Sequence, residues 1–103
     1  MHELDIAKDL SRQLAAAARA HGFTRVDRVV LKLGVLAGID PHHLAGHLAQ
    51  EAASSPLADA RYECLELAPG DELSPAEAGR PAPAGGKILA TGFEIIIAKM
   101  EGR

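Results

Sequence analysis

The sequence predicts an α/β fold of the two-layer α+β type, in which a three-stranded sheet carries two helices on one face. Apolar residues recur at steps of three and four over residues 4–21 and 41–53, which is typical of amphipathic helices. Apolar and polar residues alternate over 25–36 and 59–67, which is typical of half-buried strands, and residues 88–100 have strand character with an unusually apolar run at 95–98. Two amphipathic helices can bury their apolar stripes against such a sheet by packing on the same face.

The composition describes a single small domain, residues 1–103, with an aliphatic core. Hydrophobic residues make up 48% of the chain but aromatic residues only 3%, so Leu, Ile and Val must fill the interior. The net charge is −3 and no run of Lys or Arg occurs, which argues against nucleic acid as a partner. No apolar run reaches the ~18 residues of a membrane span and no signal peptide is recognisable, so we expect a cytoplasmic protein without a membrane partner.

The first predicted helix follows directly after the first three residues. The alanines at 15–18 favour a helix, and His21-Gly22 is a typical helix end. We expect the packing of this helix to order the chain start. Its apolar stripe consists of Leu4, Ala7, Leu10, Leu14 and Ala17 or Ala18.

A strand, a turn and a second helix follow. Asp40 is suited to cap the helix, and Pro41 is suited to its first turn because proline has no N–H to leave unpaired. Leu44 and Leu48 are expected to face inward. In the strand, alternation assigns Val29, Leu31, Leu33 and Val35 to one face and Arg28, Val30 and Lys32 to the other.

The remaining strands are separated by residues 68–87, which we predict to be a long flexible loop because four prolines and four glycines interrupt any periodicity. Cys64 is the only cysteine, so no internal disulfide can form, and we interpret it as a small buried hydrophobe in the second strand. In the last strand Ile95 and Ile97 are expected to face inward. The opposite sheet face, with Arg28, Val30, Lys32 and Ile96, is expected to be open to solvent or to a partner.

The opening tripeptide has the ligands of a planar metal site. A free α-amino group titrates near pH ~8, so a metal can displace its proton at neutral pH. The amine of Met1, the following amide nitrogen and the His2 ring can close fused chelate rings, and the amide or carboxylate of Glu3 can complete the plane. Planar nitrogen and oxygen ligands favour Ni(II) or Cu(II) over tetrahedral zinc. The alternative is a solvated chain end with a chance histidine.

A second group of histidines lies on the second predicted helix, beside His42. His43 and His47 are four residues apart, as are His47 and Glu51, so each pair shares one helical face. The two imidazoles could form an accessory metal contact. Because they supply only two ligands, the pattern favours the alternative of a solvated helix face.

The chain, read in order, resembles the HypA-type hydrogenase nickel-incorporation proteins over roughly residues 1–67 and 90–101. The resemblance is carried by Met1-His2-Glu3-Leu4, Ile6-Ala7, His21-Gly22, Arg25-Val26, Val29, Leu31, Leu33-Gly34, Leu36, Gly38, Pro41, Ala60 through Leu67, and Gly92-Phe93-Glu94-Ile95-Ile96-Ile97.

The resemblance implies a nickel metallochaperone. It implies that the amine of Met1, the ring of His2 and the amide or carboxylate of Glu3 bind Ni(II). The implied partners are the large subunit of a [NiFe]-hydrogenase, or a similar nickel enzyme, and a nickel-handling GTPase of the maturation system. Members of the family also carry a zinc module with two Cys-x-x-Cys pairs between the second and last strands. Residues 68–87 hold no cysteine and no histidine, so we expect no structural zinc here.

An adaptor module and an enzyme are the two alternative kinds of function. A metal-independent interaction or adaptor module would keep the fold without metal delivery and would use Arg28 and Lys32 to bind its partner. An enzyme is disfavoured, because no nucleophile stands beside a base at a recognisable spacing and no phosphate-binding glycine motif occurs.

Overall fold

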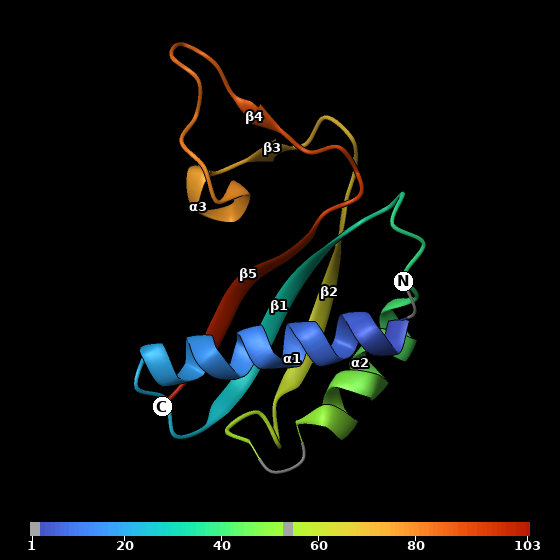
Figure 1. The fold of residues 1–103 in the computed structure, drawn as a ribbon, viewed down its shortest axis with the longest axis vertical. Helices are drawn as coiled ribbons and strands as arrows, with labels where there is room; N and C mark the ends of the chain where they lie inside the picture. The colour runs from blue at the N-terminus through green and yellow to red at the C-terminus, as the bar shows by residue number, and fades with distance from the viewer. Residues whose placement is uncertain (1–2, 53–54) are drawn as a thin grey trace.

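The computed structural model describes residues 3–52 and 55–103, and Figure 1 shows the path of the chain. Within these ranges the helices and strands are, in chain order, α1 (Glu3–Ala20), β1 (Val26–Gly34), α2 (Pro41–Glu51), β2 (Arg61–Leu67), β3 (Glu72–Leu73), α3 (Pro75–Ala78), β4 (Ile88–Leu89) and β5 (Ile95–Gly102).

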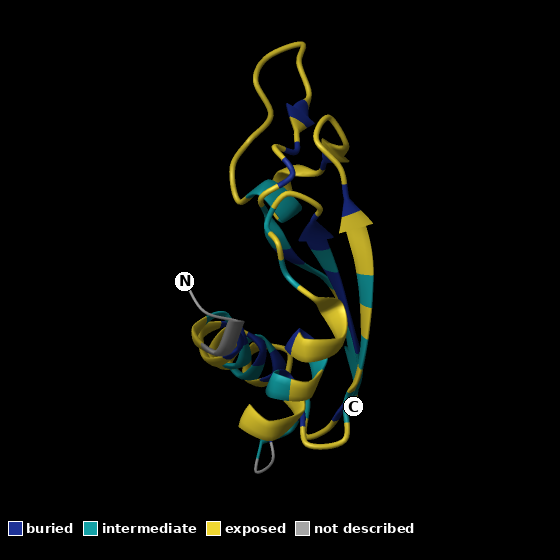
Figure 2. Cartoon of the chain, turned by 90° about the vertical axis from the view of Figure 1, so that its right-hand side faces the viewer, coloured by how far each residue is buried: buried dark blue, intermediate teal, exposed yellow. Residues whose placement is uncertain are grey.

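β1 is the central strand of a three-stranded sheet with the order β2-β1-β5. It runs parallel to β2 and antiparallel to β5. The helices α1 and α2 lie on the same face of this sheet (Figures 1 and 2). The predicted α+β class, with three strands and two helices on one face, is therefore confirmed.

The main core lies between the two helices and the sheet. The stripe predicted for α1 is buried at Ala7, Leu10, Leu14 and Ala18. On α2 the inward residues are Leu44 and Leu48, and on β1 they include Val29, Leu31 and Leu33. Val35 was expected on the same face, but this is wrong: it lies beyond the end of β1 and is 46% exposed.

Local sequence signals set the ends of both helices. After α1 the chain turns at Gly22, whose φ of 72° is in the left-handed region that glycine tolerates. At the start of α2 the Asp40 carboxylate accepts the backbone N–H groups of His42 and His43 at 2.8 and 3.2 Å. Pro41 occupies the first turn, as predicted.

Residues 68–94, which we call the lobe, extend the molecule beyond the end of the sheet at which β5 begins (Figure 1). Residues 68–87 were predicted to be a long loop without a packed element, but they contain two short elements, β3 and α3, and β3 pairs with β4. A second, smaller core closes the lobe against the sheet. It consists of Leu67, Leu73, Ile88, Ala90 and Ile96.

The start of the lobe helix was readable in the sequence but was missed. Ser74 caps α3 by accepting the N–H of Glu77, and the Glu77 carboxylate accepts the N–H of Ser74 at 2.9 Å. This reciprocal capping box has the pattern Ser-x-x-Glu, with Pro75 at the first helical position. The capping box was not used to predict a helix because the surrounding prolines and glycines favoured a loop.

The single last strand predicted over 88–100 is divided by a sharp turn. Gly92, with a φ of 94°, turns the chain between β4 in the lobe and β5 in the main sheet. The backbone closes against the end of β1 there, since Gly34 N–H donates to Glu94 O and Leu36 N–H donates to Gly92 O, both at 2.7 Å. The alternation predicted within β5 holds: Ile95 and Ile97 pack on the main core, and Ile96 packs on the lobe core.

The sheet face opposite the helices is covered in part by the lobe. Ile96, expected on an open face, is 7% exposed. The Nζ atom of Lys32 lies 2.6 Å from Oε2 of Glu77 on α3. Because the other oxygen of Glu77 completes the α3 capping box, one carboxylate both orders the lobe helix and ties it to β1.

Glu77→Gln is expected to lower the free energy of unfolding at pH 7 by about 1 kcal/mol, because it removes the charge while leaving an amide oxygen for the capping box. The Lys32 ammonium and the Ser74 N–H lower the pKa of Glu77. A depressed carboxyl pKa contributes stability above the unfolded value of about 4.3, and this contribution is lost as the pH falls through the folded pKa. The difference between wild type and variant in urea unfolding should therefore shrink between pH 7 and pH 3.

Glu72→Gln is the matched control for this prediction. Glu72 also pairs with a lysine of the lobe, Lys87, at 3.3 Å, but the two side chains are 59% and 75% exposed. Exposed pairs contribute little, so this variant should stay within about 0.5 kcal/mol of wild type at both pH values. Equal effects of the two substitutions would contradict a tethering role for Glu77.

Candidate metal centre

The predicted nickel ligands are the first three residues of the sequence, Met1, His2 and Glu3. Met1 and His2 lie outside the described residues, and Glu3 is the first residue of α1. Downstream of this point the helix is held to the core by Ala7 and Leu10, which are 0% and 4% exposed. A chelate formed by the tripeptide would thus be connected without a linker to an anchored helix.

The start of α2 lies on the same side of the molecule as the start of α1 (Figure 1). The N–H groups of His43 and His42 lower the pKa of Asp40, so this carboxyl group is ionised at neutral pH. His43 is exposed and His47 is half-buried. Together with His42, Gly46 and Gln50, these two histidines line one hollow on the surface of α2.

Cys64 packs half-buried against the main core. It lines a separate hollow with Pro41, His42, Ala45 and Tyr62. Burial raises the pKa of the Cys64 thiol, which therefore stays protonated at neutral pH. Since metals bind the thiolate, this environment favours the packing role predicted for Cys64.

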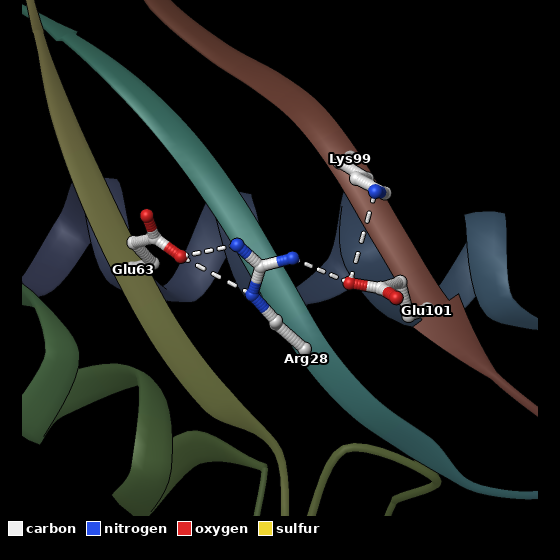
Figure 3. Close-up of polar contacts among 4 residues, drawn as sticks. All are labelled: Arg28, Glu63, Lys99 and Glu101. Carbon is white, nitrogen blue, oxygen red and sulfur yellow. Dashed lines mark hydrogen bonds and ion pairs between the residues drawn. The ribbon is translucent and has the colours of Figure 1, made fainter.

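The two cations predicted to bind a partner are engaged within the chain. Arg28 donates from Nε to Glu63 at 3.1 Å and from Nη1 to Glu101 at 2.5 Å, as Figure 3 shows. Lys99 approaches the same oxygen of Glu101 at 4.0 Å. Hydrogen bonds to Glu63 and Glu101 raise the pKa of Arg28 above its usual value. Lys32 is paired with Glu77, so neither cation is presented alone to a partner.

No three His, Cys, Asp or Glu side chains come together as a metal site within residues 3–52 and 55–103. In the same ranges, no helix combines the length and apolarity required to cross a membrane.

Comparison with known proteins matches residues 1–70 to the family described as hydrogenase/urease nickel incorporation, metallochaperone, hypA. A hydrogenase maturation factor HypA from Paracoccus denitrificans is 31% identical over 116 residues, covering 98% of each chain. A HypA from Rhodobacter capsulatus is 45% identical over 40 residues, 39% of this chain and 35% of that one.

Solved structures show the same fold. The solution structure of the Ni metallochaperone HypA from Helicobacter pylori matches with a TM-score of 0.71 at 17% identity, covering 99% of this chain and 97% of that one. The solution structure of another HypA protein matches with a TM-score of 0.68 at 15% identity, covering 100% of this chain and 97% of that one.

Proposed function

This chain belongs to the HypA family of hydrogenase/urease nickel-incorporation metallochaperones, and from this premise we propose that it binds Ni(II) through Met1, His2 and Glu3. In the proposed complex the α-amino group, the amide nitrogen of His2 and the His2 ring are three ligands, and Glu3 supplies the fourth through its amide or carboxylate. Such nitrogen-rich planar sites suit Ni(II). The observation that carries the proposal is that the family match begins at residue 1 and includes this tripeptide.

The proposed role is to deliver Ni(II) during maturation of a [NiFe]-hydrogenase-type enzyme. A chelate at a chain end is accessible from outside its plane, so an acceptor can replace its ligands one at a time. The family description and the names of the relatives support this role. The proposed partners are the hydrogenase large subunit, or a similar nickel enzyme, and a nickel-handling GTPase.

Nickel delivery is preferred to the adaptor alternative, because both cations that the adaptor would use are already paired within the chain. Pull-down from native extract separates the two functions. If the function is delivery, the wild-type protein releases nickel to the recovered acceptor and the His2→Ala variant does not. An adaptor requires that partner recovery be unaffected both by chelator and by this variant, with no nickel transferred.

We further propose that the lobe folds without zinc. Residues 68–87 contain neither cysteine nor histidine, and the lobe is instead held by the core of Leu73, Ile88 and Ala90 and by the Lys32–Glu77 pair. Apolar burial and one ion pair would thus do what a thiolate-bound ion does in relatives with a zinc module.

Treatment with EDTA is expected to leave the thermal unfolding temperature unchanged, because structural zinc sites unfold on chelation and this lobe has no thiolate ligands. The measurement is calorimetry before and after dialysis against EDTA, with metal analysis of the untreated protein. Stoichiometric zinc in the untreated protein, together with a lower unfolding temperature after its removal, would contradict the zinc-free lobe.

A further inference from the structure

The outward side of α2 brings two imidazoles together at a defined spacing. His43, Gly46, His47 and Gln50 fall at positions i, i+3, i+4 and i+7, which form one face of a helix. With His42 they line one hollow on the surface of the helix. Side chains four residues apart on a helix have Cβ atoms about 5–6 Å apart. A single ion with metal–nitrogen bonds of about 2.1 Å can bridge that separation.

The helix beneath this pair is firmly held. Leu44 and Leu48, each next to one of the two histidines, are 0% exposed in the main core. The Asp40 cap fixes the first turn. The backbone positions of His43 and His47 are therefore set before any ion arrives, which reduces the ordering cost of binding.

Gly46 leaves the surface beside the two histidines open. Gly46 lies on the same face, and a Cβ added there would meet no atom within 4 Å. A glycine inside a helix costs about 1 kcal/mol relative to alanine. At position 46 the glycine has no side chain that would project from the helix beside the two histidines.

We propose that His43 and His47 form a second binding site for a divalent transition-metal ion, with one ring nitrogen from each histidine and water in the other positions. Imidazole suits Ni(II), Cu(II) and Zn(II). With only two protein ligands the site is open, so it would hold metal more weakly than the proposed terminal chelate and exchange it readily. The proposed α2 site is independent of the terminal chelate, because His43 and His47 both belong to α2.

Titration of untagged full-length protein with Ni(II), followed by calorimetry, tests the assignment in four proteins: wild type, His2→Ala, His43→Ala/His47→Ala and the triple variant. The proposal expects a weak binding event that survives His2→Ala and disappears in both proteins that lack the α2 pair. Tight binding of Ni(II) is the event expected from the terminal chelate. The α2 site would be overturned if His43→Ala/His47→Ala removed only this tight event, or if the weak event persisted in the triple variant. If the terminal site is absent, only the tight event is missing from wild type, so the two hypotheses fail separately.

His42→Ala is the matched control. His42 borders the same hollow but is next to His43 in sequence, so its side chain points about 100° away around the helix axis. The weak event should persist after His42→Ala and be lost after His47→Ala. Equal loss in both variants would contradict the pair assigned here. Circular dichroism of each variant should remain that of wild type, because none of these histidines belongs to the buried core.

Discussion

His2→Ala is expected to lower the affinity for Ni(II) by more than about 100-fold, because loss of outer-shell partners of a metal site alone costs 10–100-fold and the His2 ring is a direct ligand in the proposed chelate. The absorption spectrum of a planar, diamagnetic Ni(II) complex should disappear together with tight binding. Isothermal titration and absorption spectroscopy of untagged protein measure both effects. Titration of wild type with Zn(II) and Cu(II) should show that zinc is disfavoured by the planar ligand set.

Two controls separate the terminal chelate from nonspecific histidine binding. His21→Ala removes an exposed imidazole that stacks on Phe23 at the far end of α1, and it should leave Ni(II) affinity unchanged. Acetylation or extension of the amino terminus should abolish tight binding as completely as His2→Ala does, because it blocks the amine. Intact mass measurement confirms that Met1 is present with a free amine. Undiminished tight binding by the blocked protein would refute the proposed ligand set.

Gly34→Ala is expected to lower the free energy of unfolding by about 2 kcal/mol or more. A Cβ at this position would lie 2.2 Å from the carbonyl oxygen of Gly92 and 2.7 Å from the nitrogen of Phe93. These are backbone atoms and cannot rotate away. The hydrogen bonds of Gly34 to Glu94 and of Leu36 to Gly92 hold them in place, so relief of the clash requires the lobe to move from the end of β1.

Gly46→Ala is the control for this substitution. A Cβ at Gly46 meets nothing within 4 Å, and alanine is the better helix former, so this variant should gain up to about 1 kcal/mol. Urea unfolding at neutral pH measures both variants. A Gly34→Ala protein within about 0.5 kcal/mol of wild type would contradict the close backbone contact between β1 and the lobe.

The elements predicted well from the sequence are those whose signals are local. The apolar stripe of α1, the alternation of β1 and the Asp40-Pro41 start of α2 each depend on residues within one or two turns or pleats. The lobe was predicted poorly for a different reason. Its small core brings together residues that are far apart in sequence, such as Leu67 and Ile96, and no periodic pattern reports such contacts.

The candidate sites divide in the same way. The sequence predicts a metal-binding role for His2 and Glu3, and it places His43 and His47 on one helical face. It correctly indicated that Ile96 faces away from the main core, but not which part of the chain covers it. The ion pairs of Lys32 and Arg28 were also unpredicted, because their partners are 35 to 73 residues away.

By itself, then, the sequence determined the fold class, the two helices, the central strand and the identity of the candidate metal ligands. Only the tertiary structure decided that residues 68–94 form a packed lobe, that Gly92 divides the last strand, and that Glu77 ties α3 to Lys32. The physical reason is that periodicity records which face of an element is buried. The neighbour that buries it is selected by the folding of the whole chain.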